Sequence, residues 1–236
     1  MKVNTKQIKA TNTAVETDYL KPLVVRASDC YKLMTNPAKK SSTLSQTTKA
    51  WLKEEAVAQV LGIKKTVLTK AIVKGVVCEF DSINLFNKVM HTNYHPNFET
   101  RELHGFRGTP DLIGTDCIIE IKTSWSANTF PFFQEDVEKQ VKKAGHHWQC
   151  RVYMMLFGIS RAVVSYCLVD TPNSDLYLTP FDTTDMHRFE GIVDHQKRVS
   201  LSQVIERDKA IEQQMLQRYE IANHYYQNYL KEIYNK

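Results

Sequence analysis

Hydrophobic and polar positions follow two different periods along the chain, and the change of period predicts its elements. Apolar residues recur every three or four positions in several long segments, which is typical of amphipathic helices, whereas β-branched runs and alternation between about 103 and 124 are typical of strands. The pattern predicts an irregular segment to about Pro22, a helix from Ser28 towards Met34, helices over roughly 49–61 and 66–90, strands near 103–113 and 116–124, a helix over roughly 134–157, a strand over 162–169 and a long helix over 200–234. Short strands followed by a helix and another strand indicate an α/β or α+β fold.

The pair of strands contains the most informative chemistry. The strands flank a Gly114-Thr115 turn, so the hairpin should bring Asp111 on the first strand beside Glu120 on the second. Because successive side chains on a strand point to opposite faces, Glu120 and Lys122 share one face and the neighbouring isoleucines take the other. Carboxylates of this kind suit Mg²⁺ or Mn²⁺, and an adjacent lysine can orient or activate an attacking water. The alternative is an ordinary strand with an ion pair on one face.

Glu79 occupies a second informative position. On the predicted helix it falls into one stripe with four apolar residues at spacings of three and four: Ile72, Val76, Ile83 and Phe86. An unpaired carboxylate on an apolar face is costly, so a metal ion or a basic partner would relieve it. The alternative is a glutamate at the edge of the stripe that reaches solvent.

The helix after the hairpin carries polar residues on two faces. Gln149 and Tyr153 are one turn apart and therefore face the same way. Another face is basic, which predicts either a phosphate-facing surface or a solvated helix face: Lys139, Lys142, Lys143, His146 and His147. The two adjacent histidines do not have a spacing that favours zinc.

Two further regions have residues suited to nucleic acid. Ser28, with Lys21 and Arg26 nearby, precedes a predicted helix whose free N–H groups and dipole can hold a phosphate, although a simple N-cap is the alternative role for this serine. The loop after Lys122 holds aromatic residues that either stack on unpaired bases or pack against the core: Trp125, Phe130, Phe132 and Phe133.

The composition predicts one globular domain over residues 1–236. Hydrophobic residues make up 42% of the chain and charged residues 24%, and no apolar run has the length of a membrane span or the position of a signal peptide. Five scattered cysteines without a C-x-x-C spacing indicate reduced thiols in a cytosolic protein. The net charge of +5 fits a polyanionic partner.

Taken together, these residues resemble the PD-(D/E)XK nuclease superfamily, with Pro110-Asp111 as the PD and Glu120-Ile121-Lys122 as the ExK. Within it, the order of the flanking motifs is similar to that of the phage lambda-type exonucleases, the viral recombinase nucleases. The resemblance covers roughly residues 20–170, leaves the 200–234 helix as an added C-terminal extension, and rests on three further motifs: Arg26-Ala27-Ser28 with Lys32-Leu-Met-Thr, Gly75 to Glu79, and Gln149-Cys-Arg-Val-Tyr153-Met leading to Phe157-Gly158.

The resemblance implies a restriction-endonuclease-like core, in which a central mixed sheet is flanked by helices, and a role for each matched residue. Asp111 and Glu120 would bind two Mg²⁺ or Mn²⁺ ions together with the Ile121 carbonyl, and Glu79 would assist them. Lys122 would position the water, Gln149 would support the site, and Ser28 would contact a terminal phosphate. The family's arginine seven positions before that serine is replaced by Lys21, which holds phosphate as a point charge; Arg26 is the candidate substitute.

The function predicted in this way is a metal-dependent deoxyribonuclease, a 5′→3′ exonuclease that degrades ends of linear duplex DNA and leaves 3′ single-stranded overhangs for recombination by strand annealing. The resemblance implies a homotrimer, a single-strand annealing protein as partner, and the cytoplasm of a phage-infected or prophage-bearing bacterial host. One alternative is a RecB-like or restriction-type nuclease with a different substrate geometry, which His104, seven residues before Asp111, keeps open. A second alternative is a catalytically inactive DNA-binding module, against which the intact Asp111, Glu120 and Lys122 argue.

Overall fold

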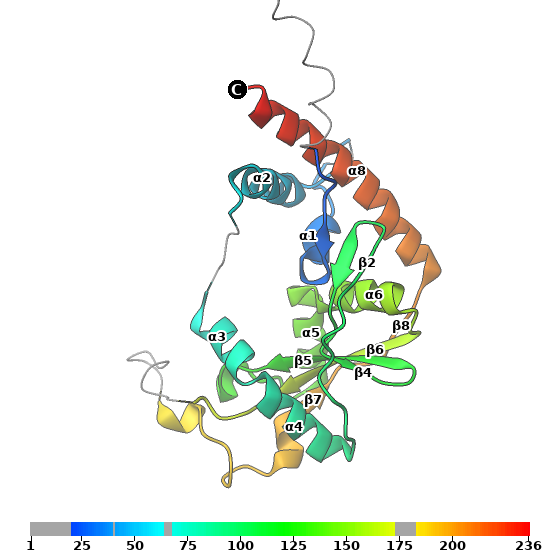
Figure 1. The fold of residues 1–236 in the computed structure, drawn as a ribbon. Helices are drawn as coiled ribbons and strands as arrows, with labels where there is room; N and C mark the ends of the chain where they lie inside the picture. Colours follow the sequence, from blue (N-terminus) through cyan, green and yellow to red (C-terminus); the bar gives the residue numbers. More distant parts are fainter. Residues whose placement is uncertain (1–19, 40, 64–67, 173–182) are drawn as a thin grey trace, which may run out of the picture.

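A mixed β-sheet forms the centre of the structure (Figure 1). The computed structural model describes residues 20–39, 41–63, 68–172 and 183–236. The sheet has the order β4-β5-β6-β7, with β8 also paired to β6, and its strands are Leu112–Ile113 (β4), Cys117–Thr123 (β5), Arg161–Cys167 (β6), Val199–Leu201 (β7) and Ile205–Glu206 (β8). Strands β5 and β6 are parallel, and the other pairs are antiparallel. A mixed sheet flanked by helices confirms the predicted fold class.

Helices cover both faces of β5. Parallel strands need a crossover, and here it consists of α5 (Gln134–Ala144) and α6 (His146–Phe157) between β5 and β6. Ile118 packs in the same core cluster as Val152 of α6, whereas Ile119 packs with Ile83 and Phe86 of α4 (Glu79–Met90) on the other face. Even-numbered side chains of β5 therefore point towards α6, which is the side where Glu120 and Lys122 lie.

A smaller sheet stands next to the first one and has the order β1-β3-β2. Its strands are Val25–Arg26 (β1), Arg101–Leu103 (β2) and Phe106–Gly108 (β3), and β1 runs parallel to β3. The β2–β3 hairpin turns at His104-Gly105, where Gly105 has φ +78° and a Cβ atom would come within 2.1 Å of the Tyr219 ring. The end of β3 is separated from Asp111 by only two residues, so this sheet leads directly into the carboxylate region.

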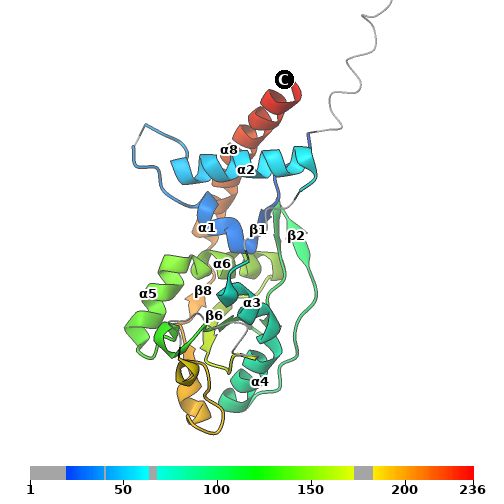
Figure 2. The same cartoon turned by 90° about the vertical axis from the view of Figure 1, so that its left-hand side faces the viewer.

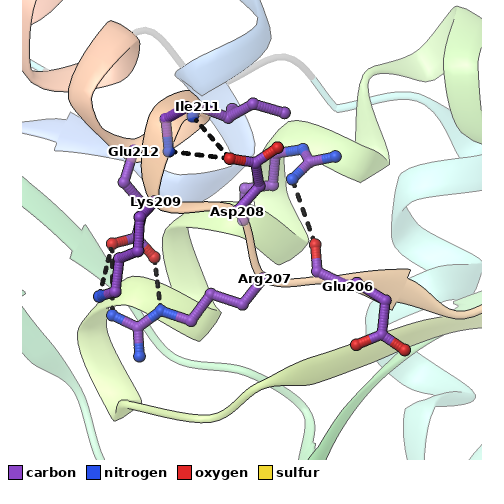
Figure 3. A network of polar contacts seen from close by, with 8 residues as sticks. Glu206, Arg207, Asp208, Lys209, Ile211 and Glu212 are labelled. Atoms are coloured by element: carbon purple, nitrogen blue, oxygen red, sulfur yellow. Dashed lines mark hydrogen bonds and ion pairs between the residues drawn. The ribbon is translucent and has the colours of Figure 1, made fainter.

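The long helix α8 (Lys209–Tyr234) packs along α2 (Gln46–Leu61), and the two helices cross above α1 (Cys30–Leu33) in Figures 1 and 2. Its first turn is fixed by side chains, because the Asp208 carboxylate accepts the amides of Ala210 and Ile211. Arg207 and Lys209 both pair with the buried Glu212 (Figure 3). In the described ranges, no helix is both long enough and apolar enough to cross a bilayer.

The helix predicted over 66–90 is two helices, α3 (Lys70–Val77) and α4, because Cys78 interrupts them with φ −100° and ψ 14°. Only the second half of the predicted apolar stripe is correct: Ile83 and Phe86 are buried, whereas Ile72 and Val76 are 45% and 69% exposed. The periodicity of one continuous helix does not carry across this break, so the two halves present different faces to the core.

The buried side chain of helix α3 is a lysine, whereas the apolar residues Ile72 and Val76 of this helix are exposed. Lys74 is 1% exposed, and its ammonium donates hydrogen bonds to the Trp125 carbonyl at 2.9 Å and the Val169 carbonyl at 2.8 Å. Burial is the largest cause of its shifted pKa, which falls to about 8. Lys74 thereby fastens α3 to the backbone just beyond the ends of β5 and β6.

Two other predicted helices have different bounds. The helix predicted over 134–157 is divided into α5 and α6 at Gly145, which has φ +75° and lies against Tyr31, where a Cβ atom would come within 2.3 Å. The helix predicted over 200–234 begins only at Lys209, because residues 199–206 contribute β7 and β8 to the sheet. These strands pair with β6, whose buried backbone groups would otherwise lack partners on that edge.

The Lys74 contacts predict a stability effect. Replacing Lys74 with Met keeps most of its volume but leaves carbonyls without a donor, each costing about 1–3 kcal/mol when buried. We expect Lys74→Met to lower the free energy of unfolding by about 2 kcal/mol or more in urea denaturation. The control is Lys88→Met on the exposed side of α4, which should change it by less than about 0.5 kcal/mol. Equal denaturation midpoints for the two variants would show that Lys74 does not hold α3.

Candidate active site

Asp111 lies against β5 because its carboxylate accepts the main-chain amide that would otherwise bond to the neighbouring strand. Asp111 Oδ2 accepts the Ile121 amide at 2.7 Å. In the β4–β5 register, Leu112 is opposite Ile119, so Pro110 would come opposite Ile121 if the pairing continued. Proline has no N–H to donate, and the amide and carbonyl of one strand residue point to the same edge. The Ile121 carbonyl therefore faces the Asp111 side with no donor available from Pro110.

Glu120 has the most demanding environment in the site. The residue is 2% exposed, and its Oε1 accepts hydrogen bonds from Lys122 Nζ at 2.6 Å and Gln149 Nε2 at 2.7 Å. Its Oε2 is also buried but has no hydrogen-bond partner among the described residues. A buried carboxylate oxygen without a partner costs free energy, and a hard cation would satisfy it.

The carboxylates repel one another. Burial and the charge of Glu120 raise the pKa of Asp111 to about 8, although Lys122 and the Ile121 amide act in the opposite direction. Glu79 adds a smaller upward contribution, so it lies close enough to act on Asp111 electrostatically. A divalent cation would reverse this repulsion by favouring the charged form of each carboxylate.

The donors that fit a divalent cation are Asp111, Glu120 and the Ile121 carbonyl. All are oxygen atoms, which Mg²⁺ and Mn²⁺ prefer. Among the described residues, no three His, Cys, Asp or Glu side chains meet in a ready-made metal cluster. The fit thus rests on two carboxylates, a main-chain carbonyl and the unpartnered Glu120 oxygen.

Lys122 is held in its charged form. Burial lowers its pKa, but the charges of Glu120 and Asp111 outweigh that effect and raise the pKa above its ordinary value. Its side chain is 25% exposed, and Nζ also lies 3.4 Å from Gln149 Oε1. An ammonium of this kind can donate hydrogen bonds to a water or a phosphate oxygen, but it has no free electron pair with which to accept a proton.

Helix α6 supplies the support for Glu120. Gln149 is buried and its amide donates both to Glu120 and, at 2.9 Å, to the Tyr153 hydroxyl, so the predicted pairing of these two α6 residues on one face is correct. His146 was not among the predicted site residues, yet it interacts with Gln149 and Lys122. Burial and the Lys122 charge lower its pKa to about 3, so this imidazole is neutral. Its spacing of three residues from Gln149 was the signal available in the sequence.

Glu79 is the first residue of α4 and not a residue in the middle of a longer helix. It is half-buried, and the break at Cys78 places it in the first turn of α4. A helix N-terminus favours a carboxylate through its free amides and dipole. The structure thus brings Glu79 to the edge of the site, where its charge acts on Asp111.

The predicted phosphate-binding residues are only partly brought together. Arg26 and Ser28 line a cavity with Gly108, Thr109 and Tyr153, whereas Lys21 is exposed outside it, and its carbonyl accepts a hydrogen bond from Gln227 of α8. Ser28 lies in the 3₁₀ turn Ala27–Asp29, which leads directly into α1, so the predicted helix start near Ser28 is confirmed, but the four residues of α1 are too short for a sizeable dipole. The roles of Lys21 and Ser28 as phosphate ligands stay predictions.

The structure also gives the positions of His104, the loop aromatics and the α5 lysines. His104 lies at the exposed tip of the β2–β3 hairpin, at the end of β3 that is farther along the chain from Asp111. Phe130 packs in the core, while Phe132 and Phe133 are 53% and 69% exposed. The three predicted basic-face lysines of α5 are exposed to solvent: Lys139, Lys142 and Lys143.

The structure is similar to solved exonucleases over most of its length. A phage related exonuclease from Haemophilus somnus 129PT aligns with a TM-score of 0.83 and 25% identity, covering 91% of this chain and 98% of that one. An alkaline exonuclease from Laribacter hongkongensis aligns with a TM-score of 0.61 and 14% identity, covering 90% and 92%. No protein-family model and no curated protein matches the sequence. The structural likeness confirms the family resemblance and the prediction that the chain is a nuclease.

The raised pKa of Asp111 predicts that cation binding depends on pH. Below about pH 8 the free carboxyl is mostly protonated, so Mg²⁺ must displace that proton, whereas well above this pH no proton is released. We expect Mg²⁺ affinity to rise with pH up to about 8 and then level off. Titration calorimetry at pH 6.5 in buffers of different ionisation enthalpy should detect a released proton, which Asp111→Asn should abolish. Equal affinity at pH 6.5 and pH 9 would contradict this view of the site.

Proposed function

We propose that this chain, a nuclease of the phage lambda-type exonuclease family, hydrolyses linear duplex DNA from its 5′ ends with the help of Mg²⁺. The single observation that carries the proposal is the buried Glu120 carboxylate, which has one oxygen held by Lys122 and Gln149 and the other without a partner. Together with Asp111 and the Ile121 carbonyl, it forms a set of oxygen donors next to a charged lysine. This arrangement suits phosphodiester hydrolysis.

Each residue has a separate task in this mechanism. Asp111, Glu120 and the Ile121 carbonyl would hold the cation, which supplies charge neutralisation for the phosphate and the leaving oxygen. Lys122 donates hydrogen bonds that orient the attacking water and stabilise the developing negative charge. Gln149 keeps Glu120 in place, and Glu79 adds negative charge that favours the bound cation.

The finer features of the proposal come from the family resemblance. They are a 5′→3′ polarity, 3′ single-stranded overhangs for recombination by strand annealing, a homotrimer, a single-strand annealing protein as partner, and the cytoplasm of a bacterial host that carries a phage or prophage. Two neighbours support a role at DNA ends, because one is described as a phage related exonuclease and the other as an alkaline exonuclease.

The two alternative functions have less support. His104, the residue that favoured a RecB-like metal site, lies at an exposed hairpin tip and, in the described part of the chain, forms no hydrogen bond or ion pair with the carboxylates, so it adds no support for that alternative. An inactive DNA-binding module does not need the buried group of Glu120, Lys122 and Gln149, which is costly to maintain unless it serves chemistry.

Digestion of end-labelled duplexes tests the proposed function. Linear duplex labelled at either the 5′ or the 3′ end should lose the 5′ label first in Mg²⁺, and closed circular duplex should remain intact. Asp111→Asn and Glu120→Gln should each lower the rate by about 10³-fold or more while DNA binding persists, because each removes an ionic ligand. The matched control is Asp116→Asn, an exposed carboxylate of the same hairpin that pairs with Arg161. Nicking of the circular duplex, or full activity of either ligand variant, would overturn the proposal.

The role of Lys122 can be separated from substrate binding. If its ammonium orients the water, Lys122→Met should reduce kcat by roughly 10²-fold or more and change KM little, which is the scale of a positioned catalytic group. Lys122→Arg keeps the charge but changes its geometry, so it should restore only part of the rate. A change confined to KM would assign Lys122 to DNA binding instead.

A further inference from the structure

His146 lies beside the catalytic lysine at the start of α6. It is the first residue of that helix, and its ring centroid lies 6.3 Å from that of Tyr166 on β6. Tyr166 is the register partner of Lys122 in the parallel β5–β6 pair, so both side chains leave the sheet on the α6 face. The imidazole therefore lies over these two strands at the level of Lys122, whose charge acts on it.

The Gln149 amide connects this histidine to the carboxylates. Both N–H groups of the amide are used, one by Glu120 Oε1 at 2.7 Å and the other by the Tyr153 hydroxyl at 2.9 Å. The amide oxygen lies 3.4 Å from Lys122 Nζ, a distance at which a hydrogen bond is weak. The amide oxygen thus has room for a closer donor.

The imidazole of His146 can provide that donor without adding charge. Burial and the charge of Lys122 lower the pKa of His146 to about 3, so the ring is neutral and has one N–H. A hydrogen bond with the Gln149 side chain acts in the opposite direction, as expected when that N–H donates to the amide oxygen. A neutral donor can lie next to Lys122 without repelling its ammonium.

This bond determines which way the Gln149 amide faces. An amide rotated by half a turn would place its oxygen against the Glu120 carboxylate and leave that buried group with one donor fewer. If the amide oxygen lost the imidazole, the nearest cation that could turn towards it is the Lys122 ammonium. That movement would take the ammonium away from Glu120 Oε1, from which it now lies 2.6 Å.

We infer that His146 is a positioning residue of the active site, which holds the Gln149 amide and thereby keeps the Lys122 ammonium directed at Glu120. The inference rests on the proposed nuclease function and deepens it by adding a residue that acts through its neighbours. Because Lys122 is assigned to the attacking water, loss of His146 should affect the catalytic step and leave DNA binding unchanged.

Steady-state digestion of linear duplex in Mg²⁺ by the full-length protein tests this role. His146→Phe keeps a ring but removes the donor, so it should lower kcat by about tenfold, the scale of a lost buried hydrogen bond, with KM unchanged. His146→Asn retains a side-chain N–H and should recover part of the loss. The matched control is His147→Phe, because this neighbouring ring lies 3.4 Å from the Val141 carbonyl and faces a different cavity beside β8.

A double-mutant cycle distinguishes positioning from a general structural effect. Gln149→Met removes the amide, so His146→Phe should cost no further kcat in that background. Additive losses of kcat, a loss confined to KM, or full activity of His146→Phe would each overturn the inference. Melting temperatures of all variants identify any loss that comes from unfolding.

A measurement on the metal-free protein separates this inference from the proposed function. The side-chain amide resonances of Gln149 in a ¹⁵N-correlation spectrum should shift in His146→Phe and stay in place in His147→Phe. Unchanged Gln149 resonances in His146→Phe would overturn the inference even in an active nuclease. If they shift but the unmodified protein does not digest DNA in Mg²⁺, the contact stands and the proposed function is overturned.

Discussion

The site depends on one place where strand pairing stops. The Gly114 amide bonds to the Cys117 carbonyl at 2.8 Å and sets the hydrogen-bonding alternation of the β4–β5 hairpin. Continued along β5, that alternation reaches Ile121 opposite a proline, which cannot donate. The Ile121 amide donates to the Asp111 carboxylate, and the Ile121 carbonyl receives no hydrogen bond from Pro110. Pro110 thus ends the strand pairing, and Asp111 is held by the amide that the proline leaves without a partner.

The same strand holds a buried carboxylate, Glu120, whose charge a bound cation would balance. Glu120 is buried on the α6 face with a single lysine to balance two repelling carboxylates, and its second oxygen has no partner among the described residues. Burying a charge is favourable only when its partners are complete. Gln149 and the neutral His146 complete one side of the carboxylate without adding charge, so the remaining deficit is concentrated at Glu120 Oε2 and Asp111. Under the proposed function, cation binding would supply the missing positive charge at these two carboxylates.

The sequence predicted the catalytic hairpin well because strand periodicity is short-ranged: a period of two residues on either side of a glycine turn determines which side chains meet. It also predicted the Gln149–Tyr153 pairing, since one helical turn is enough to place both. The failures involve tertiary contacts. Local periodicity does not show that Lys74 donates to two carbonyls beyond the ends of β5 and β6. The apolar stripe predicted across Cys78 therefore placed the wrong face of α3 against the core. Residues within 199–206 form strands because they pair with β6, and local helix or strand propensity does not show this long-range pairing.

The cavity lined by Arg26, Ser28 and Tyr153 adjoins the carboxylates along one continuous piece of chain. Three residues separate Arg107 of β3 from Asp111, which directly precedes β4, so this segment leads from the smaller sheet into the larger one. Helix α6 lies against both sheets: a Cβ atom on Gly108 would come within 2.6 Å of the Tyr153 ring, and Gln149 donates to Glu120 of β5. Such a segment cannot shift at the cavity without shifting at the carboxylates, because packed elements move as rigid units. The geometry of the cavity and that of the carboxylates are therefore coupled through this segment and through helix α6.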